Sequence, residues 1–264
     1  MSNADQVSLR PERLPALLRG EDKVVALLSS NRRSIPAGSM LVTAGDEQPF
    51  ACRVQQGWFA RLRELPDGRS QYIQLFLPGD LFALDSMFMN VHPDSIVALS
   101  DGVVQQIEHT KLRDACETDA DIAVRCTWQV LEDAGRLQSW MVCLARGSAE
   151  NRLAMFITDV RDRLAISNAI DFDASEFHLP MTQSQLGEYL GLSAVHTNRA
   201  LKSMRDNGIT TLRNKQMIIH DLDALVQLAA LVRDSHARKR AAFQSRNEHR
   251  CTSGSQFAFT ASEP

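Results

Sequence analysis

"MTQSQLGEYLGLSAVHTNRALKSMRDNGI" (residues 181–209) has the pattern of two short helices separated by a glycine turn. Thr182 and Gln185 have the spacing of a capping box, in which each side chain bonds the backbone N–H of the other residue. A helix is therefore expected to begin at this point. Gly191 permits the left-handed backbone that ends a helix, and Ser193 can cap the helix that follows.

The second of these helices has two chemically different faces. Because an α-helix has 3.6 residues per turn, one face is expected to be buried in a core and the other to meet solvent. The inward face is expected to hold Thr197, Ala200, Leu201 and Met204. The outward face then carries Ala194, Val195, His196, Asn198, Arg199 and Lys202.

Two short strands are predicted after Gly208, where ITTLRNKQMIIH places a turn at Arg213–Lys215 and so would form a β wing. Two helices, a glycine turn and a wing make a winged helix-turn-helix, whose second helix fits the roughly 12 Å major groove of DNA. No acid occurs between Val195 and Arg205, so this segment does not repel phosphates. The alternative interpretation is an ordinary solvated helix face.

Contacts to DNA are predicted from the two helix starts and from the wing. Asparagine and arginine can form bidentate pairs with adenine and guanine, and small polar or basic side chains can bind phosphates. The predicted contact residues are Thr182, Ser193, Ala194, Val195, His196, Asn198, Arg199, Lys202, Arg213 and Lys215.

A long helix with a heptad repeat is predicted upstream of this unit. Its stripe recurs at spacings of four and three along Ala123, Thr127, Val130, Ala134, Leu137, Met141 and Leu144. This repeat is typical of a helix that packs against another helix, and we predict a dimer seam formed by Val130, Ala134, Leu137, Met141 and Leu144. The alternative is one core-facing side of a lone helix.

The segment between this helix and the helix-turn-helix is expected to begin with a hinge at Gly147 and Ser148. A further helix is predicted over 149–164. The stretch ISNAIDFDASEFHLP, residues 166–180, has the composition of a polar, turn-rich linker.

Residues 35–110 have the rhythm of a β domain. Short apolar runs alternate with Gly38, Gly45, Gly57, Gly68 and Gly79. Asp67-Gly68 stands between two strand-like runs, which is a strong hairpin signal. The spacing favours a small antiparallel sandwich or roll, whose interior either holds a ligand or is filled by side chains.

The composition of the 264-residue chain allows two modest domains with real cores, since 44% of the residues are hydrophobic. Residues 1–180 hold 18 Lys and Arg against 25 Asp and Glu, whereas residues 181–264 hold 11 against 7. The basic C-terminal third fits a polyanionic partner, although an ordinary solvated surface would also explain it.

Other classes of protein are disfavoured. No apolar run is long enough to span a membrane and the N-terminus has no signal-peptide core, so we expect the cytoplasm and no membrane partner. Five widely spaced cysteines suggest reduced thiols rather than a metal site. No catalytic motif such as HExxH, a P-loop or a Ser/His/Asp set occurs in a usable context, so we expect no catalytic residues.

Three stretches together resemble the CRP/FNR family of bacterial transcription regulators. They are IPAGSMLVTAGD, QQGWFARLRELPDGRSQYIQLFLPGDLF and the helix-turn-helix stretch quoted above, in the family's order. The resemblance implies an α+β fold: an N-terminal antiparallel β-roll similar to cyclic-nucleotide-binding jelly rolls, a long dimerisation helix and a C-terminal winged helix-turn-helix. It also implies a homodimer on a palindromic DNA site and RNA polymerase as a further partner.

The expected domain division follows from these matches. Residues 1–22 form an N-terminal segment and residues 23–117 the β-roll sensor domain. The dimerisation helix takes residues 118–147, and the DNA-binding domain takes residues 148–233. A basic tail over 234–264 is expected to be disordered.

The effector pocket departs from the family pattern. In the cyclic-AMP binders of the family, a Gly-Glu pair holds the ribose and an Arg-Ser pair holds the phosphate. The matching positions of this chain are Ala83-Leu84 and Asp94-Ser95. Because an aspartate repels a phosphate and a charge-assisted bond is lost, we expect a degenerate pocket that does not bind cyclic AMP.

Cofactor binding is disfavoured as well. Oxygen-sensing relatives ligate an iron–sulfur cluster through cysteines near the N-terminus, and residues 1–51 contain none. His92 and His109 are more simply interpreted as surface residues than as haem ligands. We therefore expect no cofactor and no metal.

The DNA-reading helix departs from the family at one position. Many relatives carry Glu-x-x-Ser-Arg there, and this chain has Val195 in place of the glutamate while Arg199 keeps its place. The DNA half-site should therefore differ at one base. Two hypotheses remain: a dimeric transcription regulator that is not controlled by cyclic AMP, and a ligand- or partner-binding sensor with a vestigial helix-turn-helix.

Overall fold

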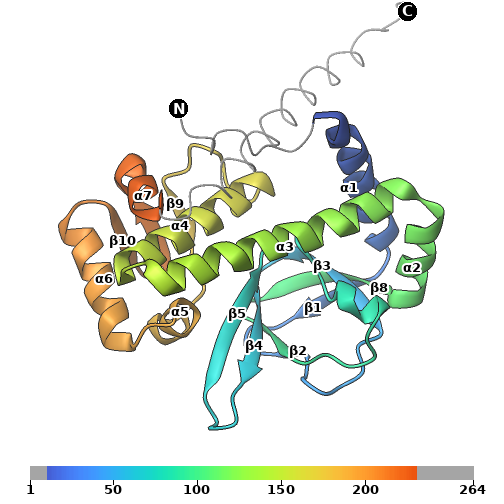
Figure 1. The fold of residues 1–264 in the computed structure, drawn as a ribbon, viewed down its shortest axis with the longest axis horizontal. Helices are drawn as coiled ribbons and strands as arrows, with labels where there is room; N and C mark the ends of the chain where they lie inside the picture. The colour runs from blue at the N-terminus through green and yellow to red at the C-terminus, as the bar shows by residue number, and fades with distance from the viewer. Residues whose placement is uncertain (1–10, 231–264) are drawn as a thin grey trace, which may run out of the picture.

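The computed structural model describes residues 11–230, and the tail predicted over 234–264 lies outside them. A β-roll, a long helix that crosses it and a smaller C-terminal unit at one end of that helix make up the molecule (Figure 1). The predicted fold class, an antiparallel β-roll joined by a long helix to a winged helix-turn-helix, is confirmed.

The β-roll consists of two four-stranded antiparallel sheets, with strand orders β1-β8-β3-β6 and β2-β7-β4-β5. Phe59, Phe76 and Phe82 stack between the sheets at centroid distances of 6.3 and 4.8 Å. Large aromatic side chains thus fill this part of the interior. The strands are β1 (Arg32–Ile35), β2 (Met40–Val42), β3 (Phe50–Gln56), β4 (Phe59–Glu64), β5 (Ser70–Phe76), β6 (Leu81–Phe82), β7 (Ser95–Ala98) and β8 (Gly102–Glu108).

The hairpin signal at Asp67-Gly68 marks the turn between β4 and β5. Leu65 and Arg69 close it through a 2.7 Å bond from the Leu65 N–H to the Arg69 carbonyl, and Gly68 has φ of 80°. A residue with positive φ at this point favours glycine, which explains why the local signal is reliable.

Helices cover the roll on the side of the long helix. They are the short 3-10 turns η2 (Pro11–Arg13) and η3 (Leu84–Met87), and the α-helices α1 (Leu14–Leu28), α2 (His109–Thr118) and α3 (Ala120–Arg146). The sequence patterns did not predict α1. A Cβ on Gly20 of α1 would lie 2.2 Å from the Asp121 carbonyl oxygen, so α1 and α3 approach more closely than any other residue at position 20 would permit.

The joint between α3 and α4 (Ala149–Ile166) consists of Gly147 and Ser148. Ser148 and Asn151 form a capping box that begins α4. The Gly147 N–H bonds the Cys143 carbonyl and closes the last turn of α3. A connection of only two residues therefore supplies backbone hydrogen bonds both at the end of α3 and at the start of α4.

The C-terminal unit contains a three-stranded sheet of order β10-β11-β9 and three further helices. The predicted linker over 166–180 is wrong in one respect, because Glu176–His178 forms strand β9, which pairs with β11. Phe177 and Leu179 of this stretch are buried, and two apolar residues are too few to mark a strand in the sequence. The remaining elements are α5 (Gln183–Leu190), α6 (Ala194–Asp206), β10 (Thr210–Arg213), β11 (Gln216–Ile219) and α7 (Leu222–Ala229).

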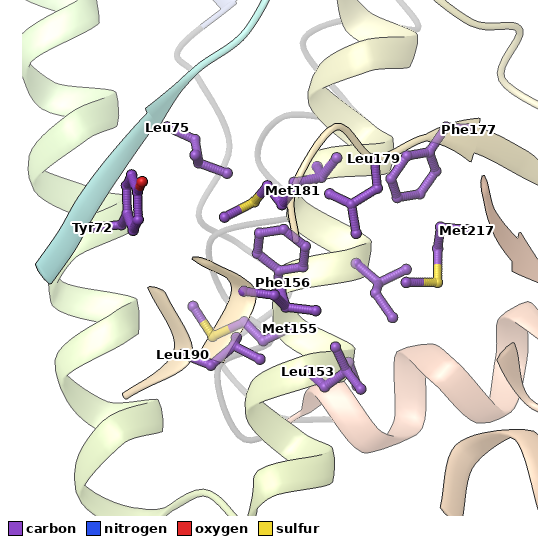
Figure 2. Close-up of a cluster of buried hydrophobic side chains, with 14 of the residues drawn as sticks. Tyr72, Leu75, Leu153, Met155, Phe156, Phe177, Leu179, Met181, Leu190 and Met217 are labelled. Atoms are coloured by element: carbon purple, nitrogen blue, oxygen red, sulfur yellow. The ribbon is translucent and has the colours of Figure 1, made fainter. Parts of the chain in front are cut away.

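One hydrophobic cluster joins the C-terminal unit to the roll (Figure 2). Phe156 of α4 lies among side chains of the C-terminal unit, and Tyr72 and Leu75 of β5 extend the same cluster into the roll. The Gln185 amide also donates to the Tyr72 hydroxyl at 3.2 Å. The orientation of the helix-turn-helix relative to the roll is thus fixed by packing and by a polar contact.

Replacing Gly187 of α5 by alanine is expected to lower the free energy of unfolding by about 1–3 kcal/mol. The added Cβ would lie 2.9 Å from both the Leu192 carbonyl oxygen and the Thr197 hydroxyl, and Thr197 is itself buried. Urea denaturation of the full chain measures the effect.

The control is Gly135→Ala in α3, because a Cβ at that position meets nothing within 4 Å. Alanine is the better helix former, so this variant should be as stable as the parent chain or more so. Equal denaturation midpoints for the two variants would contradict the close approach of α5 and α6.

Candidate nucleic-acid interface

The two helices of the helix-turn-helix are held by the predicted local contacts. The Thr182 hydroxyl accepts from the Gln185 N–H at 3.2 Å, and the Gln185 side chain accepts from the Thr182 N–H at 2.8 Å. Gly191 ends α5 with φ of 64°, and Ser193 caps α6 by accepting from the His196 N–H. Each turn and cap is therefore specified within a few residues of sequence.

Helix α6 presents a polar face to solvent at the outer edge of the molecule (Figure 1). Thr197, Ala200 and Met204 are buried against the core and Leu201 is half-buried, as the spacing predicts. The exposed residues are Ala194, Val195, His196, Asn198, Arg199 and Lys202. Val195 is 65% exposed on this face.

The wing adds two basic side chains. Arg213 and Lys215 are exposed at the tip of the β10–β11 hairpin, where Asn214 and Lys215 both have positive φ. Thr182 and Ser193 are also exposed at the N-termini of α5 and α6, where backbone N–H groups favour anions. All ten predicted contact residues are therefore accessible.

One further basic residue belongs to this surface and was absent from the predicted set. Arg205 is exposed on α6, seven residues after Asn198 and three after Lys202, so the three side chains share one side of the helix. The same spacing in the sequence could have identified it.

Asp94, a residue of the predicted effector pocket, is engaged by side chains of the roll. Asp94 is 1% exposed and forms a bidentate pair with Arg63, at 2.6 and 2.9 Å. Arg61 lies 3.9 Å from the same carboxylate and stacks on Phe76. Hydrogen bonding to Asp94 raises the pKa of the Arg63 guanidinium above its ordinary value.

The residues at the other predicted pocket positions also have structural roles. Ala83 has φ of 57° and caps the 3-10 turn η3, whose first residue is Leu84. The Ser95 hydroxyl accepts from the Ala44 N–H at 3.0 Å. These groups stabilise the roll itself.

The interpretation of His92 as a surface residue is wrong. His92 is 3% exposed, and its Nε2 lies 3.2 Å from the Asp85 carboxylate. The burial of His92 depends on how the connection before β7 folds, which the neighbouring residues do not specify. His109 is partly exposed, with Nδ1 3.2 Å from the Pro49 carbonyl oxygen.

A stripe of exposed apolar side chains runs along α3. Val130, Leu137, Met141 and Leu144 of the predicted seam are 43–69% exposed, and Ala134 is exposed with them. Leu131 and Val142 widen the stripe. A single chain leaves this face uncovered, as expected of a helix that packs against a partner.

Leu137→Glu is expected to give monomers, because the seam would have to bury an unpaired charge. Light scattering of the full chain measures the assembly. The control Gln227→Glu changes an exposed glutamine of α7, which lies outside the stripe, and should leave the assembly unchanged. A Leu137→Glu protein that stays dimeric would show that the seam lies elsewhere.

Comparison with known proteins agrees with this architecture. Residues 32–119 match the cyclic nucleotide-binding domain family, and residues 151–228 match the Crp-like helix-turn-helix domain family. The chain is 28% identical to the fumarate and nitrate reduction regulatory protein of Escherichia coli over 203 residues, which cover 77% of this chain and 80% of the relative. It is 27% identical to the anaerobic regulatory protein of Haemophilus influenzae over 197 residues, 75% of this chain and 76% of the relative.

Among solved structures, that of FixK2 from Bradyrhizobium japonicum superimposes with a TM-score of 0.67 at 25% sequence identity. The match covers 75% of this chain and 96% of FixK2. No helix in the described part of the chain is long and apolar enough to cross a membrane.

A nucleotide-binding-type roll joined by a long helix to a winged helix-turn-helix defines a transcription regulator that binds DNA. The order of the two domain matches, together with the curated relatives, identifies the family. The chain belongs to the CRP/FNR family of bacterial transcription regulators. The relatives compared above are regulators rather than enzymes.

Proposed function

We propose that this protein is a homodimer that binds a palindromic DNA site through α6 and is not controlled by cyclic AMP. The observation that carries the proposal is the exposed face of α6, which is free of acids between Val195 and Arg205. Ser193 caps this helix, and Thr182 caps the preceding helix α5. A helix of this kind can enter the major groove without phosphate repulsion.

The residues of this face have separable roles in the proposal. Arg199 reads a guanine through O6 and N7, and Val195 contacts an apolar group such as a thymine methyl. Ser193 and Lys202 bind phosphates and set the register. Thr182, Ala194, His196, Asn198, Arg213 and Lys215 complete the proposed contact surface.

Dimerisation through the exposed stripe of α3 explains the palindrome. A two-fold axis along the seam would present two copies of α6 to successive major grooves, about 34 Å apart along one face of the duplex. Two identical half-sites would then be read by identical side chains.

The Asp94–Arg63 pair supports independence from cyclic AMP. A phosphate at this position would face a buried carboxylate that already holds the nearest guanidinium. Binding would require that the half-exposed Arg63 leave the buried Asp94 carboxylate, whose remaining basic neighbour, Arg61, lies 3.9 Å away.

The alternative, a sensor with a vestigial helix-turn-helix, is less consistent with α6. The caps at Thr182 and Ser193 and the turn at Gly191 are intact, and Arg199 is exposed on α6, as a functional helix-turn-helix requires. We further propose that the protein acts in the cytoplasm on promoter DNA, with RNA polymerase as a partner and no cofactor.

Titration calorimetry with cyclic AMP is expected to show no saturable heat. The buried Asp94 carboxylate repels the phosphate and Arg63 is already engaged, so both requirements of the nucleotide site fail. Binding at micromolar concentration would contradict the proposal.

Arg199→Ala is expected to cost about 1–3 kcal/mol on the site selected from random DNA and to flatten preference at one symmetric guanine. Lys202→Ala should weaken all sequences alike and lower the salt slope by about one unit, since it removes a phosphate contact. Binding to single-base variants at several salt concentrations separates the two effects.

Glu176→Gln provides the control, because this exposed residue on β9 belongs to the same unit and lies outside the proposed contact set. Its affinity should equal that of the parent chain. If Arg199→Ala loses affinity evenly over every sequence, base reading belongs to Val195, His196 and Asn198 instead.

A further inference from the structure

Two cysteines meet at the corner where α2 ends and α3 begins. Asp119 alone separates the two helices, and the sulfurs of Cys116 and Cys126 lie 3.9 Å apart across the corner. Both are free thiols in the structure. The other described cysteines lie apart from this pair, since Cys52 and Cys143 each belong to a different hydrophobic cluster.

The two thiols differ in their access to solvent. Cys126 is 5% exposed and belongs to one buried cluster with Val24 and Leu28 of α1, whereas Cys116 is partly exposed near the end of α2. Burial raises the pKa of Cys126 to about 12, and the neighbouring Cys116 adds to this rise. Burial also raises the pKa of Cys116, but the contact with Cys126 opposes the rise. Cys116 is therefore the thiol that a dissolved reagent can reach, and Cys126 lies behind it.

The start of α3 is held in place, whereas the end of α2 faces solvent. Lys23 of α1 pairs with Asp119 at 2.7 Å and with Asp121 at 2.9 Å. Residues 117–118 at the end of α2 are exposed. A disulfide has an S–S length of about 2.05 Å, so the two sulfurs must approach by roughly 2 Å. We expect rotation of the Cys116 side chain and a small shift of the last turn of α2 to bring them together.

The surroundings of the pair favour cross-linking over metal binding. Among residues 11–230 no group of three or more His, Cys, Asp or Glu side chains is placed to hold a metal ion. Two thiols without further ligands are too few for the usual tetrahedral site. Chemistry that needs only two sulfurs in contact is therefore the chemistry that fits this corner.

We propose that Cys116 and Cys126 form a dithiol site that a hydroperoxide converts into an intramolecular disulfide. The Cys116 thiolate attacks the terminal oxygen of the hydroperoxide and breaks the O–O bond, which gives a sulfenic acid and an alkoxide. The alkoxide takes the proton that Cys116 lost and leaves as an alcohol, or as water when the oxidant is hydrogen peroxide.

The second step closes the disulfide. The Cys126 sulfur attacks the Cys116 sulfur, so that the S–S bond forms and the hydroxyl group leaves as water with the Cys126 proton. Two thiols and one hydroperoxide thus give one disulfide, one alcohol and one water. Exchange with a reduced dithiol restores both thiols.

The site stands at the start of the helix that carries the predicted dimer seam. Cys126 precedes Val130, the first residue of the seam, by about one turn of α3. A cross-link to α2 would therefore constrain the end of α3 at which the seam begins. An effect of oxidation on DNA binding rests on the proposed function, whereas formation of the disulfide does not.

Peptide mapping of the full chain, before and after treatment with hydrogen peroxide, tests the site. Trypsin cleaves after Arg125 and so separates the two cysteines, which then lie on peptides 114–125 and 126–136. A cross-linked pair of these two peptides should appear after oxidation and disappear after treatment with dithiothreitol. A non-reducing gel should show that the link lies within one chain.

Cys116→Ser should abolish the cross-link. Cys126→Ala keeps its position apolar and removes the second thiol, so peroxide should leave a sulfenic acid on Cys116 that dimedone labels. Cys251→Ser is the matched control, because Cys251 lies outside the described residues, and it should form the link as the parent chain does. The site is overturned if the parent chain gives no link between the two peptides, or if Cys116 and Cys126 appear only in links to other cysteines.

The regulatory effect is read from the affinity of the reduced and the cross-linked protein for the selected DNA site. A change of about fivefold or more is expected, in the range of measured allosteric couplings, and Cys116→Ser should show none after the same treatment. Equal affinities of the two forms would overturn the coupling. Failure of the reduced chain to select any DNA would instead overturn the proposed function, and the peptide mapping would stand apart from it.

Discussion

The buried ion pair between Arg163 and Asp80 holds the DNA-binding unit on the roll. Arg163 of α4 donates to the Asp80 carboxylate and, at 2.7 Å, to the Leu75 carbonyl oxygen of β5. Asp80 also accepts from the Leu77 N–H at 2.7 Å, which fixes the turn before β6. Breaking such a pair leaves an uncompensated buried charge and typically costs about 3–5 kcal/mol. The position of α4, and of everything packed on it, depends on this contact.

The same contact explains how the roll can influence the proposed DNA-binding surface, which lies on α6 in the C-terminal unit. Helix α4 packs on α6 and α7, and Phe156 contacts Tyr189 of α5. A displacement of the turn that carries Asp80 would therefore move α4 and the helix-turn-helix with it. Because packed interiors change between discrete arrangements rather than deforming smoothly, such a displacement would reorient α6 as a body.

The features that could be predicted from the sequence are those that depend on residues close together in the chain. Thr182, Gln185, Gly191 and Ser193 act within four residues of themselves, and their roles in the helix-turn-helix were predictable for that reason. The apolar stripe of α3 is likewise periodic. What could not be predicted depends on long-range contact, since β9 is recognisable only from its pairing with β11. The buried residues of α1 recur at helical spacing, a local signal that could have identified this helix.

The predicted effector-pocket residues show most clearly that long-range contacts are hard to predict from the sequence. The sequence places an aspartate where a phosphate-binding arginine is expected, but the partner that neutralises it, Arg63, is 31 residues earlier. His92 is buried beside Asp85 for a similar reason, since the fold of the connection before β7 decides its exposure. Pairing of charges across a β-roll has no periodic signature in the sequence.

The short joint between α3 and α4 determines how the two halves can move. A Cβ at Gly147 would lie 2.6 Å from the Cys143 carbonyl oxygen, so the chain turns there more tightly than any other residue would permit. Ser148 and Asn151 cap α4 directly afterwards, and Arg152 donates to the Leu144 carbonyl oxygen at 2.9 Å. Rotation about this joint would break the cap and that bond together. A shift of α3 at the seam would therefore be carried to α4 through this joint.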